Sequence, residues 1–145
     1  RYRSRLISKI MFGAYNKHIK NVRTVNDWLT RDEAVVDEYN AGKLTTFLFT
    51  VNGYRGLMNM ILYVRKPRNI ERIPKNLPML MISGLDDPVG EYGKGVYRAY
   101  NSYHGHIDDI DLRLYEDCRH ELCNELNKEE IYEEIYGWIM NHMSK

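Results

Sequence analysis

The chain has 145 residues, of which 43% are hydrophobic and 28% are charged, and its formal net charge is +1. This length and composition fit one ordinary globular domain and exclude a disordered chain. The near-zero net charge argues against nucleic acid or an anionic membrane as the main partner, and we expect no transmembrane segment because the sequence has no sufficiently long apolar run.

Two cysteines, Cys118 and Cys123, are the only ones in the sequence. They are too few for a disulfide framework, so we expect a protein of the reducing cytoplasm. The sequence begins at Arg1 rather than at a methionine and shows no signal peptide. This start is consistent with a processed product or with a piece of a longer protein.

The first half of the chain has helical periodicity and few turn signals. Apolar residues within 6–11 recur at three- and four-residue spacing, which predicts an early amphipathic helix. Thr30 and Glu33 have the spacing of a capping box and predict the start of a second helix, with Thr30 as its N-cap. Another apolar pattern predicts a third helix at about 52–65, and residues 66–75 are expected to form a linker.

From residue 77 onward the pattern becomes strand, helix, strand, helix. The predicted strands are Met79–Ser83 and Asp109–Tyr115, and the predicted helices are Gly93–Tyr103 and Lys128–His142. Two strands joined by a helix form a parallel βαβ unit. Because two parallel strands cannot cover their own edges, we expect a further strand to pair with Met79–Ser83.

A carboxylate follows the first predicted strand and a histidine follows the second. Asp87 and His120 occupy these positions, and Asp86 is the competing acid. Catalytic groups gather at the carboxyl ends of parallel strands, and an acid followed by a histidine is the order of these groups in the α/β-hydrolase triad. The plainer interpretation is an Asp-Pro turn with a solvated carboxylate and a structural histidine.

Other chemistries find less support. Cys118, His120 and Cys123 lack a nearby fourth zinc ligand, and the sequence gives no sign that the Cys118 thiolate is stabilised as a nucleophile. We therefore expect no metal and no organic cofactor. The sequence has no G-x-S-x-G motif and no glycine-rich phosphate loop, and none of its serines lies on a nucleophile elbow.

Residues 77–90 read Leu-Pro-Met-Leu-Met-Ile-Ser-Gly-Leu-Asp-Asp-Pro-Val-Gly. This run resembles the acid segment of the lysophospholipase and monoacylglycerol-lipase-like serine hydrolases, also described as serine-aminopeptidase-like. Their pattern is a strand, Gly, two variable residues and Asp-Pro-Val, which places the triad acid at Asp87. Residues 115–125 resemble the histidine segment, Tyr-x-x-x-Arg-His-Glu followed by Asn-Glu, which places the triad histidine at His120.

Residues 15–17 and 24–32 resemble the helical cap of the same family, which is inserted after the sixth core strand and covers the active site. The resemblance implies an α/β chain that is the C-terminal part of an α/β-hydrolase fold. Residues 1–75 would be the cap or lid segment, and residues 76–145 would be the C-terminal βαβα part of the core. The first six core strands, the oxyanion-hole loop and the nucleophile elbow have no counterpart in this chain.

The resemblance implies a fragment or subunit of a serine hydrolase that cleaves carboxylic esters, of the lysophospholipid or monoacylglycerol-like kind. Asp87 would orient His120, and the nucleophile would come from outside this chain. We expect the chain alone to be inactive and to pair with the missing N-terminal half or with a second copy. The alternative is a non-catalytic interaction module that pairs with another chain.

Overall fold

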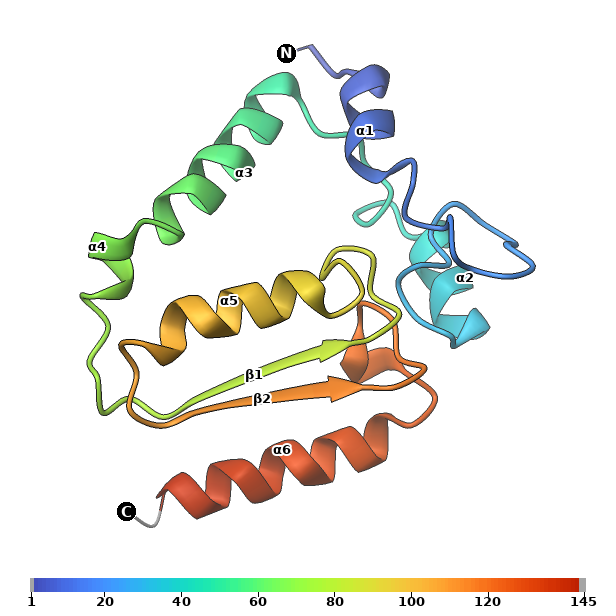
Figure 1. Ribbon diagram of the computed structural model, residues 1–145. Helices are drawn as coiled ribbons and strands as arrows, with labels where there is room; N and C mark the ends of the chain where they lie inside the picture. The colour runs from blue at the N-terminus through green and yellow to red at the C-terminus, as the bar shows by residue number, and fades with distance from the viewer. Residues whose placement is uncertain (1, 144–145) are drawn as a thin grey trace.

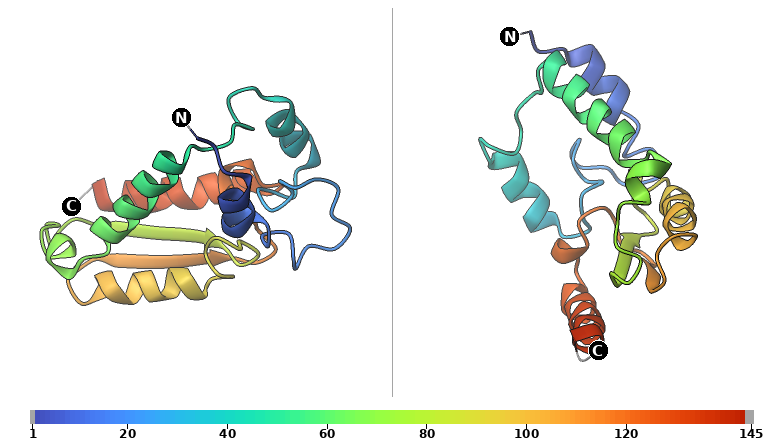
Figure 2. Two further views of the ribbon diagram at one scale, coloured as in Figure 1. Left: turned by 90° about the horizontal axis from the view of Figure 1, so that it is seen from above. Right: turned by 90° about the vertical axis from the view of Figure 1, so that its left-hand side faces the viewer.

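A two-stranded parallel sheet lies between two helices in the second half of the chain (Figure 1). The computed structural model describes residues 2–143. Strand β1 (Met79–Gly84) pairs with β2 (Ile110–Tyr115), with Met79 opposite Ile110 and Gly84 opposite Tyr115. Helix α5 (Lys94–His104) covers one face and α6 (Lys128–Met143) covers the other, which Figure 2 shows from above. The predicted α/β class is therefore confirmed.

Helices precede the sheet in the first half of the chain. They are α1 (Arg5–Phe12), α2 (Glu33–Ala41), α3 (Val51–Val64) and the short α4 (Pro67–Ile70). The three predicted helices are present, but α4 lies within the predicted linker. Pro67 suits its first turn because a proline there has no backbone N–H to leave unpaired, and Ile70 is buried.

The predicted N-cap of α2 is wrong. Asp32 is the N-cap, and its carboxylate accepts hydrogen bonds from the backbone N–H groups of Ala34 and Val35. The Thr30 hydroxyl instead donates to the carbonyl of Asn124, at 2.7 Å, and Thr30 is buried. The sequence spacing predicted that the Thr30 side chain caps the helix, but it binds the distant Asn124 carbonyl instead.

The core of the second half lies where α6 packs on the sheet. Cys118, Leu122 and Ile131 are buried together, and Ile82 and Tyr115 from the two strands pack against them. Polar contacts also bind α6 to β2. The Tyr115 hydroxyl lies 3.0 Å from a carboxylate oxygen of Glu134, and the Trp138 indole N–H donates to Asp111 at 2.7 Å. Together these contacts set how α6 lies along β2.

A buried ion pair joins the two halves. Glu125 is fully buried, and its carboxylate accepts from the Arg31 Nε–H at 2.8 Å. The backbone N–H groups of Arg31 and Arg119 donate to the same carboxylate, at 3.3 and 2.7 Å. The segment before α2 is therefore bound to the loop that follows β2.

Several apolar side chains remain exposed on the N-terminal helices, including Leu6 and Ile10 on α1 and Met60 and Leu62 on α3. Among residues 2–143, no strand pairs with the outer edge of β1. No helix in this part of the chain is long and apolar enough to cross a membrane. The described chain thus presents unpaired backbone and apolar surface at the same time.

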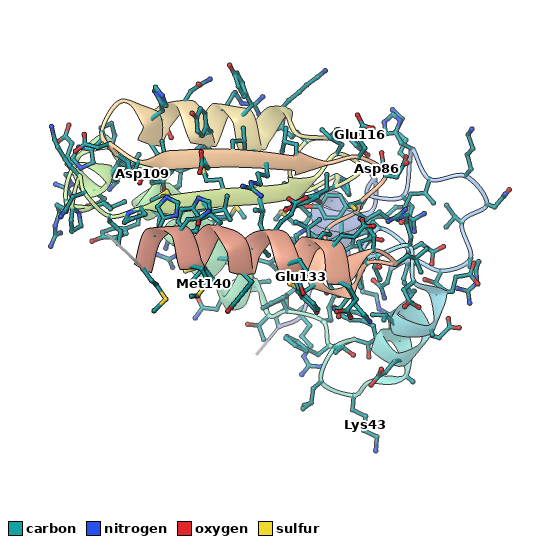
Figure 3. All side chains as sticks on the ribbon, turned by 90° about the horizontal axis from the view of Figure 1, so that it is seen from below. Lys43, Asp86, Asp109, Glu116, Glu133 and Met140 are labelled. Carbon is teal, nitrogen blue, oxygen red and sulfur yellow. The ribbon has the colours of Figure 1, made fainter. Side chains whose placement is uncertain are left out.

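Replacing Glu125 with Ala is expected to lower the free energy of unfolding by about 3 kcal/mol, because the Arg31 guanidinium would lose its buried partner. Glu125→Gln keeps an acceptor oxygen and is expected to cost less. Glu133 is exposed on α6 (Figure 3), so Glu133→Ala is the matched control and should change stability by less than about 0.5 kcal/mol. Urea unfolding measures all three, and equal stability of the Glu125→Ala and Glu133→Ala variants would contradict the assigned role.

Candidate active site

The loops that follow β1 and β2 meet beyond the carboxyl ends of both strands. Hydrogen bonding continues past the strands, since the Leu85 N–H donates to the Tyr115 carbonyl and the Asp86 N–H donates to the Cys118 carbonyl, both at 2.9 Å. Backbone contacts therefore bring the segment with the predicted acid next to the segment with the predicted histidine.

Gly84 permits this close approach. A Cβ atom at this position would lie 2.0 Å from the carbonyl oxygen of Cys118 and 2.3 Å from that of Arg119. No other residue could be accommodated without displacing the histidine loop, because both obstacles are backbone atoms. The glycine thus fixes how near the two loops can come.

Asp87 and His120 form a hydrogen-bonded dyad. The Oδ2 atom of Asp87 lies 3.1 Å from Nδ1 of His120. The other carboxylate oxygen accepts from the Val89 N–H at 2.8 Å, and Asp87 is only 5% exposed. Asp86, the competing acid, is exposed and makes no hydrogen bond to His120. The geometry therefore selects Asp87 as the partner of the imidazole.

The other ring nitrogen of His120 is Nε2. No described residue hydrogen-bonds Nε2 of His120, and 37% of the side chain is exposed. With Nδ1–H donating to a carboxylate, the neutral imidazole carries its lone pair at Nε2, which can accept a proton from a reacting group. This arrangement is that of a general base oriented by an acid.

The electrostatics of the site favour the imidazolium form. The hydrogen bond to Asp87 raises the pKa of His120, partial burial opposes it, and the negative charges of Asp87 and Glu121 add to the increase. The same carboxylate acts on its neighbours. Burial and the charge of Asp87 raise the pKa of Tyr15, and burial with the charges of Asp86 and Asp87 raises that of Tyr92.

Aromatic side chains from the N-terminal half lie next to the dyad, a contact that the sequence patterns did not predict. The ring of Trp28 lies 5.1 Å from that of His120, and Tyr15 contacts Trp28 edge-on at 4.9 Å between centroids. Both residues occur in the segments that resemble the cap, and this resemblance was the available signal that they could lie near the active site. Their spacing gave no sign of which core residue they contact.

Among residues 2–143, no group of potential metal ligands includes Asp87 or His120. Cys118 is buried, with Sγ 3.4 Å from Oδ1 of Asn127, and burial raises the pKa of its thiol, whereas Cys123 is exposed. Among the described residues, one group of carboxylate and imidazole atoms lies within ligating distance, and it comprises Asp109, Asp111 and His142. Figure 3 shows Asp109 at the end of the sheet opposite to Asp86 and Glu116, so this group is remote from the dyad.

Among residues 2–143, no serine hydroxyl hydrogen-bonds to His120. Ser83 is the one closest in sequence to the acid, but it is 7% exposed and its hydroxyl lies 3.3 Å from the carbonyl oxygen of Gly84. Ser144 lies outside the described residues. In the described residues the side-chain partner of His120 is thus Asp87.

Comparisons with known proteins place the chain in a family. Two solved structures share its fold. One is a highly thermostable carboxyl esterase from Bacillus coagulans in complex with glycerol, with 25% identity, a TM-score of 0.79, and coverage of 98% of this chain and 46% of the esterase. The other is a lipase in an open form, with 19% identity, a TM-score of 0.86, and coverage of 100% of this chain and 47% of the lipase.

The chain thus spans less than half the length of either structure, and the fold they share with it is part of an α/β-hydrolase fold. No curated protein matches the chain. The family model for serine aminopeptidase, S33, matches residues 2–127, which is most of the chain. The chain therefore belongs to the serine aminopeptidase S33 family of α/β hydrolases.

Proposed function

We propose that this chain is the C-terminal part of a serine hydrolase that cleaves carboxylic esters, and that Asp87 and His120 are the acid and the base of its triad. The observation that carries the proposal is the 3.1 Å contact between Asp87 Oδ2 and His120 Nδ1. It lies beyond the carboxyl ends of two parallel strands, where open α/β sheets place their active sites. The carboxyl esterase and the lipase that share the fold support the reaction class.

The proposed chemistry uses the free Nε2 of His120. A serine hydroxyl from outside this chain attacks the ester carbonyl, and His120 accepts the hydroxyl proton as the new C–O bond forms. When the tetrahedral intermediate collapses, the imidazolium returns this proton to the leaving alkoxide. Water then attacks the carbonyl of the acyl-enzyme and gives a proton to His120. When this second intermediate collapses, the bond between the acyl carbon and the serine oxygen breaks, the proton goes back to the serine, and the carboxylic acid leaves.

The proposed substrates are lysophospholipids or monoacylglycerol-like lipids. Residues 1–75 are proposed as a cap or lid and residues 76–145 as the C-terminal part of the core. The family resemblance motivates this division, and exposed apolar side chains on α1 and α3, such as Leu6 and Met60, fit a segment that meets acyl chains or the rest of the enzyme. We also propose the cytoplasm as its compartment, because Cys118 and Cys123 are both free thiols.

The proposed partner is a polypeptide that supplies the rest of the sheet. This is the N-terminal half of the hydrolase or, in its absence, a second copy of the chain. The open edge of β1 offers unpaired backbone groups to a further strand. The nucleophile and the oxyanion donors would come with the N-terminal half, whereas a second copy would only cover the open edge.

In the enzyme assembled with its upstream segment, Asp87→Asn is expected to lower kcat on a short-chain ester by about 10⁴-fold, because the carboxylate that fixes the tautomer and stabilises the imidazolium is lost. Asp86→Asn is the matched control, since the adjacent exposed carboxylate does not contact His120. Equal losses in the two variants would reject Asp87 as the triad acid.

The same enzyme should lose activity on the acid side as His120 becomes protonated. Because the pKa of His120 is raised, the inflection of kcat/KM is expected above pH ~6.5, the ordinary value for histidine. Glu121→Gln removes a negative charge that favours the imidazolium, so it should move the inflection to lower pH. Glu116→Gln, at the same end of the sheet (Figure 3), should leave it in place. A shift in the opposite direction for Glu121→Gln would contradict this account.

The chain without its upstream segment is expected to hydrolyse no ester and to remain unlabelled by a fluorophosphonate probe. It is also expected to sediment as a dimer or a larger species at micromolar concentration, because the open edge of β1 pairs with a strand of another chain. Labelling of any serine in stoichiometric amounts would refute the proposal that the nucleophile lies outside the chain. If the longer protein is also inactive but still associates, the interaction-module alternative is favoured.

A further inference from the structure

We propose that Trp28 is a positioning residue for His120, and that its indole ring stabilises the imidazole in the charged state bound to Asp87. This inference rests on the proposed function, because the charged state is the one that forms when His120 takes the nucleophile's proton. It assigns a role in the reaction to a residue that lies more than 90 positions from the histidine in the sequence.

The distance between the rings permits this interaction. The centroids of Trp28 and His120 are 5.1 Å apart and their planes are tilted by 47°. A cation within about 6 Å of an aromatic centroid is attracted by the ring, and tryptophan is the strongest partner. Trp28 is half-buried, so the contact is only partly screened by water. When His120 is neutral this attraction is largely absent, so the contact is stronger with the imidazolium.

Hydrogen bonds join the turn that carries Trp28 to the loop that carries His120. The Arg119 guanidinium donates from Nη1 to the carbonyl oxygens of Asp27 and Thr30, at 2.7 and 2.9 Å. The Glu121 N–H donates to the Leu29 carbonyl at 2.7 Å. The residues on both sides of His120 therefore bind the short turn that carries Trp28. These bonds hold the backbone of the Trp28 turn against the loop that carries His120.

One side chain packs on the indole, and another orders the turn that carries it. Tyr15 contacts Trp28 edge-on, at 4.9 Å and 72°. The carboxylate of Asp27 is buried and accepts from the backbone N–H of Arg23, at 2.6 Å, and from the Thr24 hydroxyl, also at 2.6 Å. The turn is thus ordered by its own hydrogen bonds as well as by those to the histidine loop.

The charged groups around the imidazole do not make the indole redundant. Asp87, from the β1 loop, and Glu121, beside His120, are the carboxylates that favour the imidazolium. The Arg119 guanidinium is directed to the carbonyls of Asp27 and Thr30. Asp27, from the N-terminal half, is occupied by donors of its own turn. Trp28 is the aromatic ring in contact with His120 among the described residues, so its effect can be separated from theirs by substitution.

The test is an NMR titration of the histidines in the 145-residue chain, which needs no nucleophile and no substrate. A stabilising indole predicts that Trp28→Leu lowers the pKa of His120 by roughly 0.4–1.5 units. If Trp28 only excluded water, its removal would relieve the desolvation of the imidazolium and raise the pKa instead. The sign of the shift therefore separates the two roles.

Two further variants complete the test. Trp28→Phe keeps a weaker aromatic face and should lower the pKa by a smaller amount, which preserves the test if Trp28→Leu does not fold. Phe12→Leu is the matched control, because Phe12 contacts Tyr15 and Tyr54 rather than His120. An unchanged or raised pKa in the folded Trp28 variants overturns the inference.

The outcome is independent of the proposed ester hydrolysis. A lowered pKa in the Trp28 variants, together with an inactive full-length protein, would reject the proposed function and leave the contact established. An active enzyme in which the pKa of His120 is unchanged when Trp28 is replaced would support the proposed function and reject the role of Trp28.

Discussion

The buried carboxylate of Glu125 organises the part of the molecule that carries the dyad of Asp87 and His120. A carboxylate removed from water is strongly destabilising unless donors surround it. Here the Arg31 guanidinium, the backbone N–H groups of Arg31 and Arg119, and that of Leu126 all point to it. The loop that carries His120 can therefore adopt few arrangements in which this charge stays satisfied. The network specifies the loop's position more than it adds stability.

One consequence is that the N-terminal half belongs to the site rather than merely covering it. Arg31 reaches across to Glu125, Arg119 reaches back to the carbonyls of Asp27 and Thr30, and the Thr30 hydroxyl donates to Asn124. These contacts run in both directions between the turn before α2 and the loop after β2. The dyad is consequently well formed although β1 has an open edge. A complete sheet is not what brings Asp87 to His120.

Sequence patterns predicted the elements well, because strands and helices follow from local periodicity. They also predicted that Asp87 and His120 lie close together, because strand ends converge in a parallel sheet. They failed at Thr30, whose partner Asn124 is 94 residues away, and at Trp28, whose contact with His120 depends on that same long-range docking. In the sequence, Glu125 is not distinguished from the many other acids in its region, because its burial depends on where the fold places Arg31. Each failure concerns a side chain whose role is set by a distant segment.

The spacing within the acid motif has a physical cause in this structure. Gly84 closes the strand, and only a glycine there lets the backbone of Cys118 and Arg119 approach. The Asp86 N–H then binds the Cys118 carbonyl, which fixes the register of the two loops. The next residue, Asp87, then contacts the imidazole of His120, which lies two residues after Cys118. A glycine three positions before the acid is thus the condition for two neighbouring strands to present an acid and a histidine to each other.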